Sequence, residues 1–303
     1  MCVSVITVNY NTSAKTIELI KSLNRFVDLA YEVIVVDNFS DPADFQQLEA
    51  YCDQQDAVRL IRNNVNSGFG AGNMLGCNYA NFPYLAFINN DVVLLEDSLL
   101  KLKQFMDLNT RVGVVTPQQV SAGGKITRSF DYFHGIRRTL FGQWPLELFS
   151  DGSRSRSSEK FDGPFAVDFV QGCFMFFRAS AFYRCGGFDT NLFLYCEEMD
   201  ICYRLKQHGY ERYFYPQSKF QHESRGSTEP GFAIKIEPKL SFLYVSRKHH
   251  NYCKYLILKY FLLLRFLLKG LSDPRYFRLA WDIWSEKILQ RSIKQRQYQP
   301  SID

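Results

Sequence analysis

Three apolar runs in the first third of the chain each end in polar residues, and no other feature constrains the fold as much. They begin at residues 3, 32 and 84 and have the sequences VSVITVNYN, EVIVVDN and YLAFINND. Near-continuous β-branched and apolar runs are typical of parallel strands buried on both faces. Segments with apolar residues at helical spacing lie between them, together with a further strand signal, AVRLIRN, from residue 57. This alternation predicts an α/β fold with a Rossmann-like, mostly parallel sheet flanked by helices.

The composition fits a globular chain and gives two further expectations. Apolar residues make up 46% and aromatic residues 16% of the 303 residues, which excludes intrinsic disorder. The eight cysteines are scattered without a CxxC pair, which favours reduced, buried thiols in a cytosolic protein over disulfides or a zinc site. Because the first residues already have strand character, we expect no signal peptide.

The alternation stops after residue 115. Residues 121–163 are polar and rich in Gly and Ser, which predicts a long, mobile surface segment. Core-like sequence resumes at residue 166 and includes a helix closed by Gly209 and a strand, YERYFYP. We therefore expect two halves of one body, residues 1–115 and 116–240, and a helical extension over residues 241–303.

The extension is basic and aromatic. Residues 243–303 hold 12 Lys and Arg against 4 Asp and Glu, whereas residues 1–242 hold 24 against 27. Its densest apolar stretch, residues 255–268, is shorter than the ~20 residues that span a bilayer. Two interpretations stay open: a helix that lies on an anionic membrane leaflet, or a buried helix whose Lys and Arg reach solvent.

Asn89, Asn90 and Asp91 follow the run that begins at residue 84. The carboxyl edge of a parallel sheet is where α/β folds bind their ligands. A metal–phosphate site normally has two acids there and this triplet offers one, so a weakened metal site and a polar turn both fit it. His222, near the end of the core-like sequence, is a candidate second metal ligand.

Two other segments are candidates for binding a nucleotide. Asp37 and Asn38 end the second run, where such side chains hydrogen-bond a base or a ribose but also cap helices. The stretch NVNSGFGAGN, from residue 64, is expected to be a glycine-rich loop that leads into a helix. Its G-x-G-x-G spacing differs from the G-x-G-x-x-G of nicotinamide-binding loops, so a dehydrogenase is a minor alternative.

The sequence LYCEEMDICYRL, from residue 194, places Glu197, Glu198 and Asp200 at the start of a helix. The helix dipole stabilises acids there, which is the simplest explanation of the cluster. Three acids in four residues exceed what capping needs, and crowded carboxylates raise one another's pKa, as a general base requires. We therefore favour a catalytic role for this cluster.

Taken in order, these motifs resemble those of family 2 glycosyltransferases with the GT-A fold. The likeness covers residues 3 to about 225 and is strongest to the rhamnosyltransferase-like branch that builds bacterial surface polysaccharides. The motifs concerned are VSVITVNYN, VIVVDN, NVNSGFGAGN, FINNDV and GGFDTNLFLYCEEMDICYRL, followed by a histidine. The resemblance implies that residues 1–115 bind the nucleotide sugar and that residues 116–240 bind the acceptor and hold the catalytic groups.

The resemblance also implies a role for each candidate residue. Glu198 would be the catalytic base, with Glu197 its acidic neighbour and Asp200 the acid that begins the helix. Asp91 would bind Mg²⁺ or Mn²⁺ through the donor's diphosphate, and His222 would help to hold the metal. Residues 186–189, GGFD, would approach the acceptor. The residues implied in nucleotide-sugar binding are Thr7, Asn9, Asn11, Asp37, Asn38, Asn66, Gly68, Gly70, Asn73, Asn89 and Asn90.

The activity implied is an inverting, metal-dependent transfer of a sugar from a nucleotide sugar to a lipid-linked saccharide or a growing surface polysaccharide. L-Rhamnose from dTDP-rhamnose is the leading donor, and UDP-hexoses stay open. The implied place is cytoplasmic, peripheral to the inner face of the cell membrane, with no nucleic-acid partner and with a homodimer left open. A non-catalytic nucleotide-sugar-binding scaffold is the alternative, and its only support is Asn89, which stands where the family has an acid.

Overall fold

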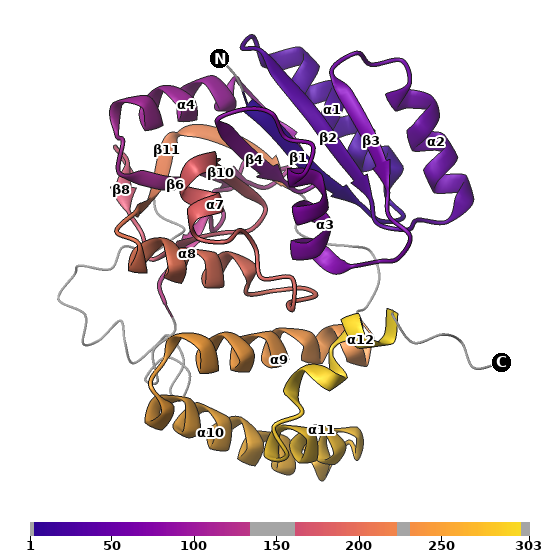
Figure 1. Cartoon of the computed structure of the whole chain (residues 1–303), viewed down its shortest axis with the longest axis vertical. Coiled ribbons are helices and arrows are strands. Elements are labelled where there is room, and N and C mark those ends of the chain that lie inside the picture. The colour runs from indigo at the N-terminus through magenta and orange to yellow at the C-terminus, as the bar shows by residue number, and fades with distance from the viewer. Residues whose placement is uncertain (1–2, 134–160, 223–230, 298–303) are drawn as a thin grey trace. The chain divides into compact units, whose positions relative to one another are not determined.

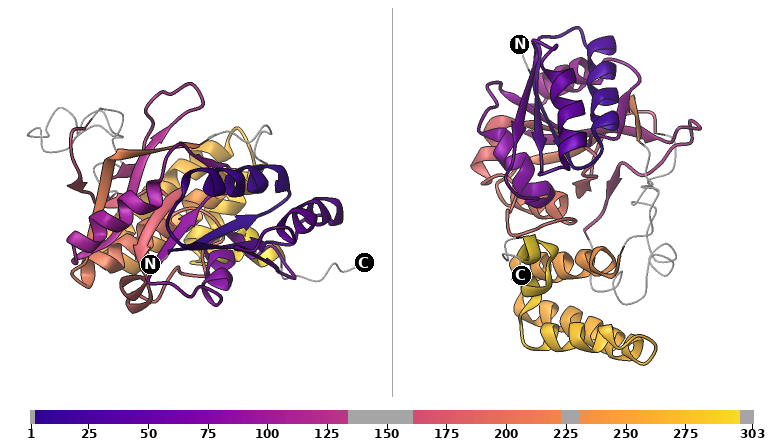
Figure 2. Two further views of the ribbon diagram at one scale, coloured as in Figure 1. Left: turned by 90° about the horizontal axis from the view of Figure 1, so that it is seen from above. Right: turned by 90° about the vertical axis from the view of Figure 1, so that its right-hand side faces the viewer.

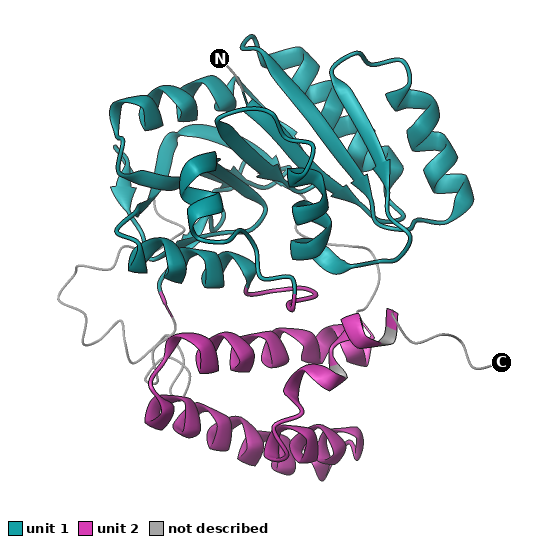
Figure 3. Ribbon diagram, viewed as in Figure 1, with its two compact units in different colours: residues 1–132, 156–190, 197–229 teal, residues 133–155, 191–196, 230–303 magenta. Residues whose placement is uncertain are grey.

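The computed structural model describes residues 3–133, 161–222 and 231–297 (Figure 1). The chain divides into two compact units (Figure 3). Unit 1 comprises residues 1–132, 156–190 and 197–229, and unit 2 comprises residues 133–155, 191–196 and 230–303. Most of the surface segment expected over residues 121–163 lies outside the described residues, at 134–160.

The first half of unit 1 has the predicted alternation of strands and helices. The strands β1, β2, β3 and β4 are parallel and adjacent in the order β3-β2-β1-β4. Their carboxyl ends therefore meet at one edge of the sheet, where Asn9 is paired with Asp37. The bounds of these elements are β1 Val3–Asn9, α1 Ser13–Phe26, β2 Tyr31–Asp37, α2 Pro42–Cys52, β3 Val58–Arg62, α3 Gly68–Cys77 and β4 Tyr84–Ile88.

The other half of the sheet is mixed rather than parallel. β10 (Phe174–Arg178) lies antiparallel between β4 and β6 (Val112–Val120), and β11 (Glu211–His222) runs parallel to β6. β5 (Val92–Leu94) pairs antiparallel with the end of β11. The remaining short strands are β8 (Phe165–Ala166), which pairs with β11, and β7 (Phe130–Asp131) and β9 (Phe169–Val170), which pair with each other.

Helices cover both faces of this sheet (Figure 2). Alternate strand residues point to opposite faces. On one face, Val5 and Val35 belong to a core formed with α1, α2 and α4 (Ser98–Leu108). On the other face, Phe87 and Phe177 pack against Phe182 of α7 (Ala179–Arg184). Burial on both faces explains why the strands lack polar alternation.

The glycine-rich stretch is a loop over residues 64–67 and helix from Gly68 onward, so the helix begins earlier than expected. α3 begins at Gly68, so Gly70 and Gly72 lie within the helix. The glycines allow α3 to lie very close to β1, because a Cβ added at Gly72 would be 3.1 Å from Val8 Cγ2 and one at Gly76 would be 2.6 Å from Ile6 Cγ2. Close packing therefore accounts for Gly72 and Gly76, whereas Gly68, with a positive φ of 84°, has the backbone conformation that glycine adopts most readily.

Unit 2 is helical. It contains α9 (Phe232–His249), α10 (Tyr252–Gly270), α11 (Arg275–Trp284), the 3₁₀ helix η1 (Ile288–Arg291) and α12 (Ile293–Gln297). Phe266 of α10 stacks on Tyr276 of α11 with ring centroids 5.8 Å apart. Within the described residues, no helix combines the length and the apolar character that crossing a bilayer requires.

The thiols follow the prediction in part. Seven described cysteines are free, and Cys52, Cys77, Cys173, Cys185 and Cys202 are buried. Cys196 is half-buried and Cys253 is exposed.

Candidate active site

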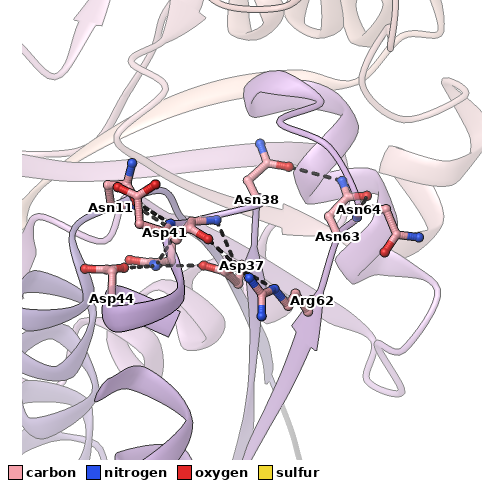
Figure 4. A network of polar contacts seen from close by, with 10 residues as sticks. Asn11, Asp37, Asn38, Asp41, Asp44, Arg62, Asn63 and Asn64 are labelled. Atoms are coloured by element: carbon pink, nitrogen blue, oxygen red, sulfur yellow. Dashed lines mark hydrogen bonds and ion pairs between the residues drawn. The ribbon is translucent and has the colours of Figure 1, made fainter. Parts of the chain in front are cut away.

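Polar side chains at the carboxyl ends of β1 and β2 form a buried hydrogen-bond network (Figure 4). Asn9 Nδ2 donates to Asp37 Oδ1 at 3.0 Å and to Asp44 Oδ2 at 2.9 Å. Asn11 has a positive φ of 54° and its Oδ1 accepts from the backbone N–H of Asp41 at 2.7 Å. These bonds fix the two loops that follow β1 and β2.

Asn38 joins the same edge to the start of α3. Its Nδ2 donates to Asn66 Oδ1 at 3.0 Å and to the carbonyl of Gly68 at 3.1 Å, and its Oδ1 accepts from the N–H of Ser67 at 3.2 Å. Asn73 donates to the carbonyl of Phe69 within α3. The predicted nucleotide-binding amides are thus brought together, and most of their hydrogen-bonding groups are used within the protein.

The turn between β4 and β5 is anchored on both sides. Asn90 Nδ2 donates to Thr12 Oγ1 at 2.7 Å and to Thr16 Oγ1 at 2.9 Å. The N–H of Asn89 donates to the carbonyl of Cys173 at 2.9 Å. Anchored in this way, the turn fixes the backbone on which the Asp91 carboxylate stands.

The side chain of Asp91 contacts that of His222, although the two residues are distant in the sequence. The end of β11 pairs with β5, and His222 lies opposite Val92. Asp91 Oδ1 is consequently 3.1 Å from His222 Nε2, with the side chains 24% and 14% exposed. The other ring nitrogen, Nδ1, is buried and makes no hydrogen bond with the described residues.

A carboxylate beside an imidazole is a donor set that suits a divalent cation. In the described part of the chain, no group of three or more His, Cys, Asp or Glu side chains is arranged to hold a metal ion. The pair therefore fits a cation that takes its remaining ligands from phosphate and water, as Mg²⁺ does in nucleotide sites. Asp91 and His222 would hold that cation.

The acid cluster lies in the first turn of α8 (Glu197–Gln207). Tyr195 and Cys196, directly before the helix, have positive φ angles of 72° and 68°. Left-handed backbone at two consecutive non-glycine residues is strained, and such strain is common at active sites. Glu197 is buried, and its Cγ lies beside Gly70 of α3, where an added Cβ would be 3.5 Å away.

Glu198 is half-buried and lies beside Gly172, where an added Cβ would be 3.7 Å from Glu198 Oε2. Burial raises the pKa of Glu198 to about 7, and the negative charge of Asp131 acts in the same direction. A carboxyl with this pKa is half ionised near neutral pH, as a general base requires.

Cys173 links the two parts of the site. Burial raises the pKa of its thiol to about 12, and the charges of Asp91 and Glu198 both add to the rise. The N–H of Asn89 donates to the carbonyl of Cys173, and Glu198 lies beside the neighbouring Gly172, so the turn that holds Asp91 and the candidate base lie near the same residue. Cys173 Sγ donates to Gln119 Oε1 at 3.3 Å.

Asp200 is not directed at the same space. It is fully buried and its Oδ2 accepts from Arg204 Nε at 3.0 Å. Arg204 Nη1 also donates to the carbonyls of Cys185 and Gly187. Asp200 thus holds Arg204, and Arg204 ties α8 to the loop that the family resemblance implies approaches the acceptor.

Sequence reasoning missed several residues of this site. Asp131, Cys173 and Arg204 were not assigned roles, because their proximity to the acids depends on pairings between distant segments. Tyr10 and Phe39 are exposed aromatic residues, at 48% and 54%, in the loops after β1 and β2. Phe39 also has a positive φ of 70°. Its position directly after Asp37 and Asn38 is the only feature of the sequence that could have indicated it.

Comparison with known proteins decides the family. The model of glycosyl transferase family 2 matches residues 4–186, which run from β1 through β10 and α7. The chain is a member of glycosyl transferase family 2. The assignment made from the motifs is confirmed, and so is the GT-A-like α/β fold.

Two relatives are rhamnosyltransferases. Rhamnosyltransferase WbbL of Escherichia coli is 26% identical over 253 residues, which are 76% of this chain and 88% of that protein. The N-acetylglucosaminyl-diphospho-decaprenol L-rhamnosyltransferase of Mycobacterium tuberculosis is 24% identical over 268 residues, 82% of this chain and 85% of that protein. This family 2 member thus resembles the rhamnosyltransferase branch.

Solved structures share the fold at low identity. GalNAc-T7 with UDP, GalNAc and Mn²⁺ has a TM-score of 0.64 and 15% identity, covering 96% of this chain and 54% of that one. S. aureus TarS 1–349 in complex with UDP-GlcNAc has a TM-score of 0.60 and 15% identity, covering 96% and 81%. The glycosyltransferase role rests on the family, and the donor and acceptor do not follow from these likenesses.

Proposed function

We propose that this glycosyltransferase is metal-dependent and inverting, and that it transfers L-rhamnose from dTDP-rhamnose to a lipid-linked saccharide. The observation that supports this most is the contact between Asp91 and His222 at the edge of the sheet. Glu198, whose pKa is raised to about 7, lies near the same edge, beside Cys173. Transfer of a sugar from a nucleotide diphosphate needs two components, which are ligands for a divalent cation and a separate general base.

The proposed reaction is a single displacement. An acceptor hydroxyl oxygen attacks the anomeric carbon of the donor sugar, and Glu198 takes the hydroxyl proton. The bond between the anomeric carbon and the diphosphate oxygen breaks, and the nucleoside diphosphate leaves with the electron pair. A divalent cation held by Asp91 and His222 would supply charge neutralisation of the diphosphate. Attack opposite the leaving group, without an enzyme nucleophile, inverts the anomeric configuration.

The choice of donor and acceptor rests on the relatives. Both carry the name rhamnosyltransferase, and the mycobacterial name includes a diphospho-decaprenol-linked sugar. A lipid-linked acceptor implies work at the cytoplasmic face of the membrane. A non-catalytic scaffold is disfavoured because a binding role does not need the raised pKa of Glu198.

The test is a donor screen with the purified chain. dTDP-rhamnose, UDP-glucose, UDP-galactose and UDP-N-acetylglucosamine are each supplied with and without Mn²⁺, and release of nucleoside diphosphate is measured. We expect release from dTDP-rhamnose with Mn²⁺ and a loss of at least ~100-fold in Asp91→Ala and Glu198→Gln.

Glu49→Gln is the matched control, because Glu49 is an exposed acid on α2. Circular dichroism should show that all three variants fold like the natural chain. Ordinary turnover by either site variant would contradict the assigned roles, and a preference for a UDP-hexose would replace the donor.

A further inference from the structure

Helix α10 is apolar on two opposite sides. One stripe, which includes Tyr255, Leu262 and Phe266, is buried within unit 2. The opposite stripe is exposed: Leu264 is 58% and Leu268 is 60% exposed. An ordinary surface helix has only one apolar stripe, and its other side is polar.

Helix α11 continues the exposed stripe. Phe277, Trp281 and Trp284 are spaced as one helical face, and the two tryptophans are 66% and 56% exposed. Trp284 contacts Tyr260 of α10 with ring centroids 6.3 Å apart, so the two stripes form one surface. We call this surface the docking face; it consists of Ile257, Tyr260, Leu264, Leu268, Leu271, Phe277, Trp281 and Trp284.

The docking face has cations along one side and no acid on α10. Helix α10 contains four Lys and Arg residues and no Asp or Glu. Lys259 is buried and bonds Glu286 at 3.2 Å. The other three, Lys254, Arg265 and Lys269, are spaced so that they follow one side of the exposed stripe.

We propose that the docking face binds an anionic lipid bilayer, with its aromatic and aliphatic side chains in the headgroup boundary and the cations on lipid phosphates. Trp and Tyr favour the membrane interface, and basic flanks add attraction to anionic lipid. Two copies of the chain meeting through this face would bring like charges together, so charge complementarity favours a lipid surface over self-association. This binding rests on the proposed function and extends it, because it would hold the enzyme at the membrane surface that contains a lipid-linked acceptor.

The test measures binding and not sugar transfer, so its outcome is separate from that of the donor screen. The full chain is sedimented with phosphatidylcholine vesicles that contain or lack phosphatidylglycerol. We expect at least ~10-fold stronger partitioning onto the anionic vesicles, with a decrease as salt is raised. The double variant Leu264→Glu/Trp281→Glu should lose at least ~10-fold of this partitioning.

Matched controls come from unit 1. Leu108 is 86% exposed on α4, so Leu108→Glu should leave vesicle binding unchanged. Arg265→Glu/Lys269→Glu should weaken binding to anionic vesicles alone, and Lys125→Glu in an exposed loop should not. Equal partitioning of docking-face and control variants would overturn the proposal. So would a lipid-free dimer that Leu264→Glu/Trp281→Glu dissociates without changing vesicle binding.

Discussion

Glu198 is a carboxyl whose surroundings make it a base near neutral pH. Its side chain is half-buried beside Gly172, and burial raises its pKa to about 7. The charge of Asp131 adds to the rise, and Asp131 is itself held by Arg128 at 2.8 Å. We therefore expect Asp131 to act on the proposed base through its charge, by raising the pKa of Glu198.

The pH dependence of turnover tests this role. Because the base must be ionised, the rate should fall as pH decreases through about 7. Asp131→Asn removes a negative charge near Glu198 and leaves the Arg128 cation in place, and both changes favour the ionised base. The acid side of the profile should then move to lower pH by roughly half a unit.

Measurement of kcat across pH 5–9, for the natural chain and Asp131→Asn, checks this shift. Asp56→Asn, in the turn before β3, is a control that should leave the profile in place. An unchanged profile in Asp131→Asn would show that Asp131 does not act on the base.

Single residues were predictable from the sequence where a motif holds them. Glu198 and Asp91 stand in short motifs that resemble those of the family, so a role for each could be inferred from the sequence. Asp131 had no such pattern, because it reaches the site through the pairing of β7 with β9. A contact between distant segments leaves no periodic signal in either one.

At the scale of elements, Arg204 joins α8 to the loop before it through hydrogen bonds. The guanidinium pairs with Asp200 of the same helix and donates to the carbonyls of Cys185 and Gly187. Gly186 and Gly187 both have positive φ, at 82° and 67°. Arg204 thus positions the loop that leads to Asp189 relative to the helix that begins with Glu197.

Variants of Arg204 separate positioning from stability. Lysine retains a charge for Asp200 but lacks the planar fork that reaches both carbonyls. We expect Arg204→Lys to raise the acceptor KM or lower kcat about tenfold, while hydrolysis of donor in the absence of acceptor stays near normal. Arg204→Met also removes a cationic partner of the buried Asp200 carboxylate and should destabilise the fold by about 3 kcal/mol.

Steady-state kinetics with and without acceptor, together with urea unfolding, check both effects. Arg184→Met, on the exposed side of α7, is the matched control. Equal loss of transfer and hydrolysis in Arg204→Lys would argue for a general defect and against positioning.

Element type was predictable for the first half of the sheet and less so for the second. The long apolar runs predicted β1, β2 and β4. The antiparallel insertion of β10 between β4 and β6 was not foreseen, because the aromatic run FMFFR shows burial but not direction. Gly70 and Gly72 were expected in a loop, although both lie within α3 and Gly72 lets that helix pack closely on β1.

For the whole molecule, Asp91 and His222 predict that metal and donor bind together. Two protein ligands are too few to hold a cation firmly, and a diphosphate completes the set. Nucleotide and cation should therefore each strengthen the binding of the other.

Thermal unfolding of the full chain measures this coupling. dTDP with Mn²⁺ at about 100 times the dissociation constant should stabilise the folded chain by about 2.7 kcal/mol, which corresponds to a rise of roughly 4 °C in the melting temperature. Mn²⁺ alone should have little effect. In His222→Ala the added effect of Mn²⁺ should largely disappear, and the shift with dTDP alone should remain. A full shift with Mn²⁺ alone would contradict the coupling.

The satisfied network at the ends of β1 and β2 has a consequence for altering the donor. Asn9 and Asn38 already bond Asp37, Asp44 and Asn66, so replacing these amides would loosen the scaffold before it changed which nucleotide is accepted. The exposed rings of Tyr10 and Phe39 have no such duty, and aromatic rings stack on bases with little discrimination. Replacing those two rings with hydrogen-bonding side chains should therefore add discrimination between bases while the asparagines stay untouched.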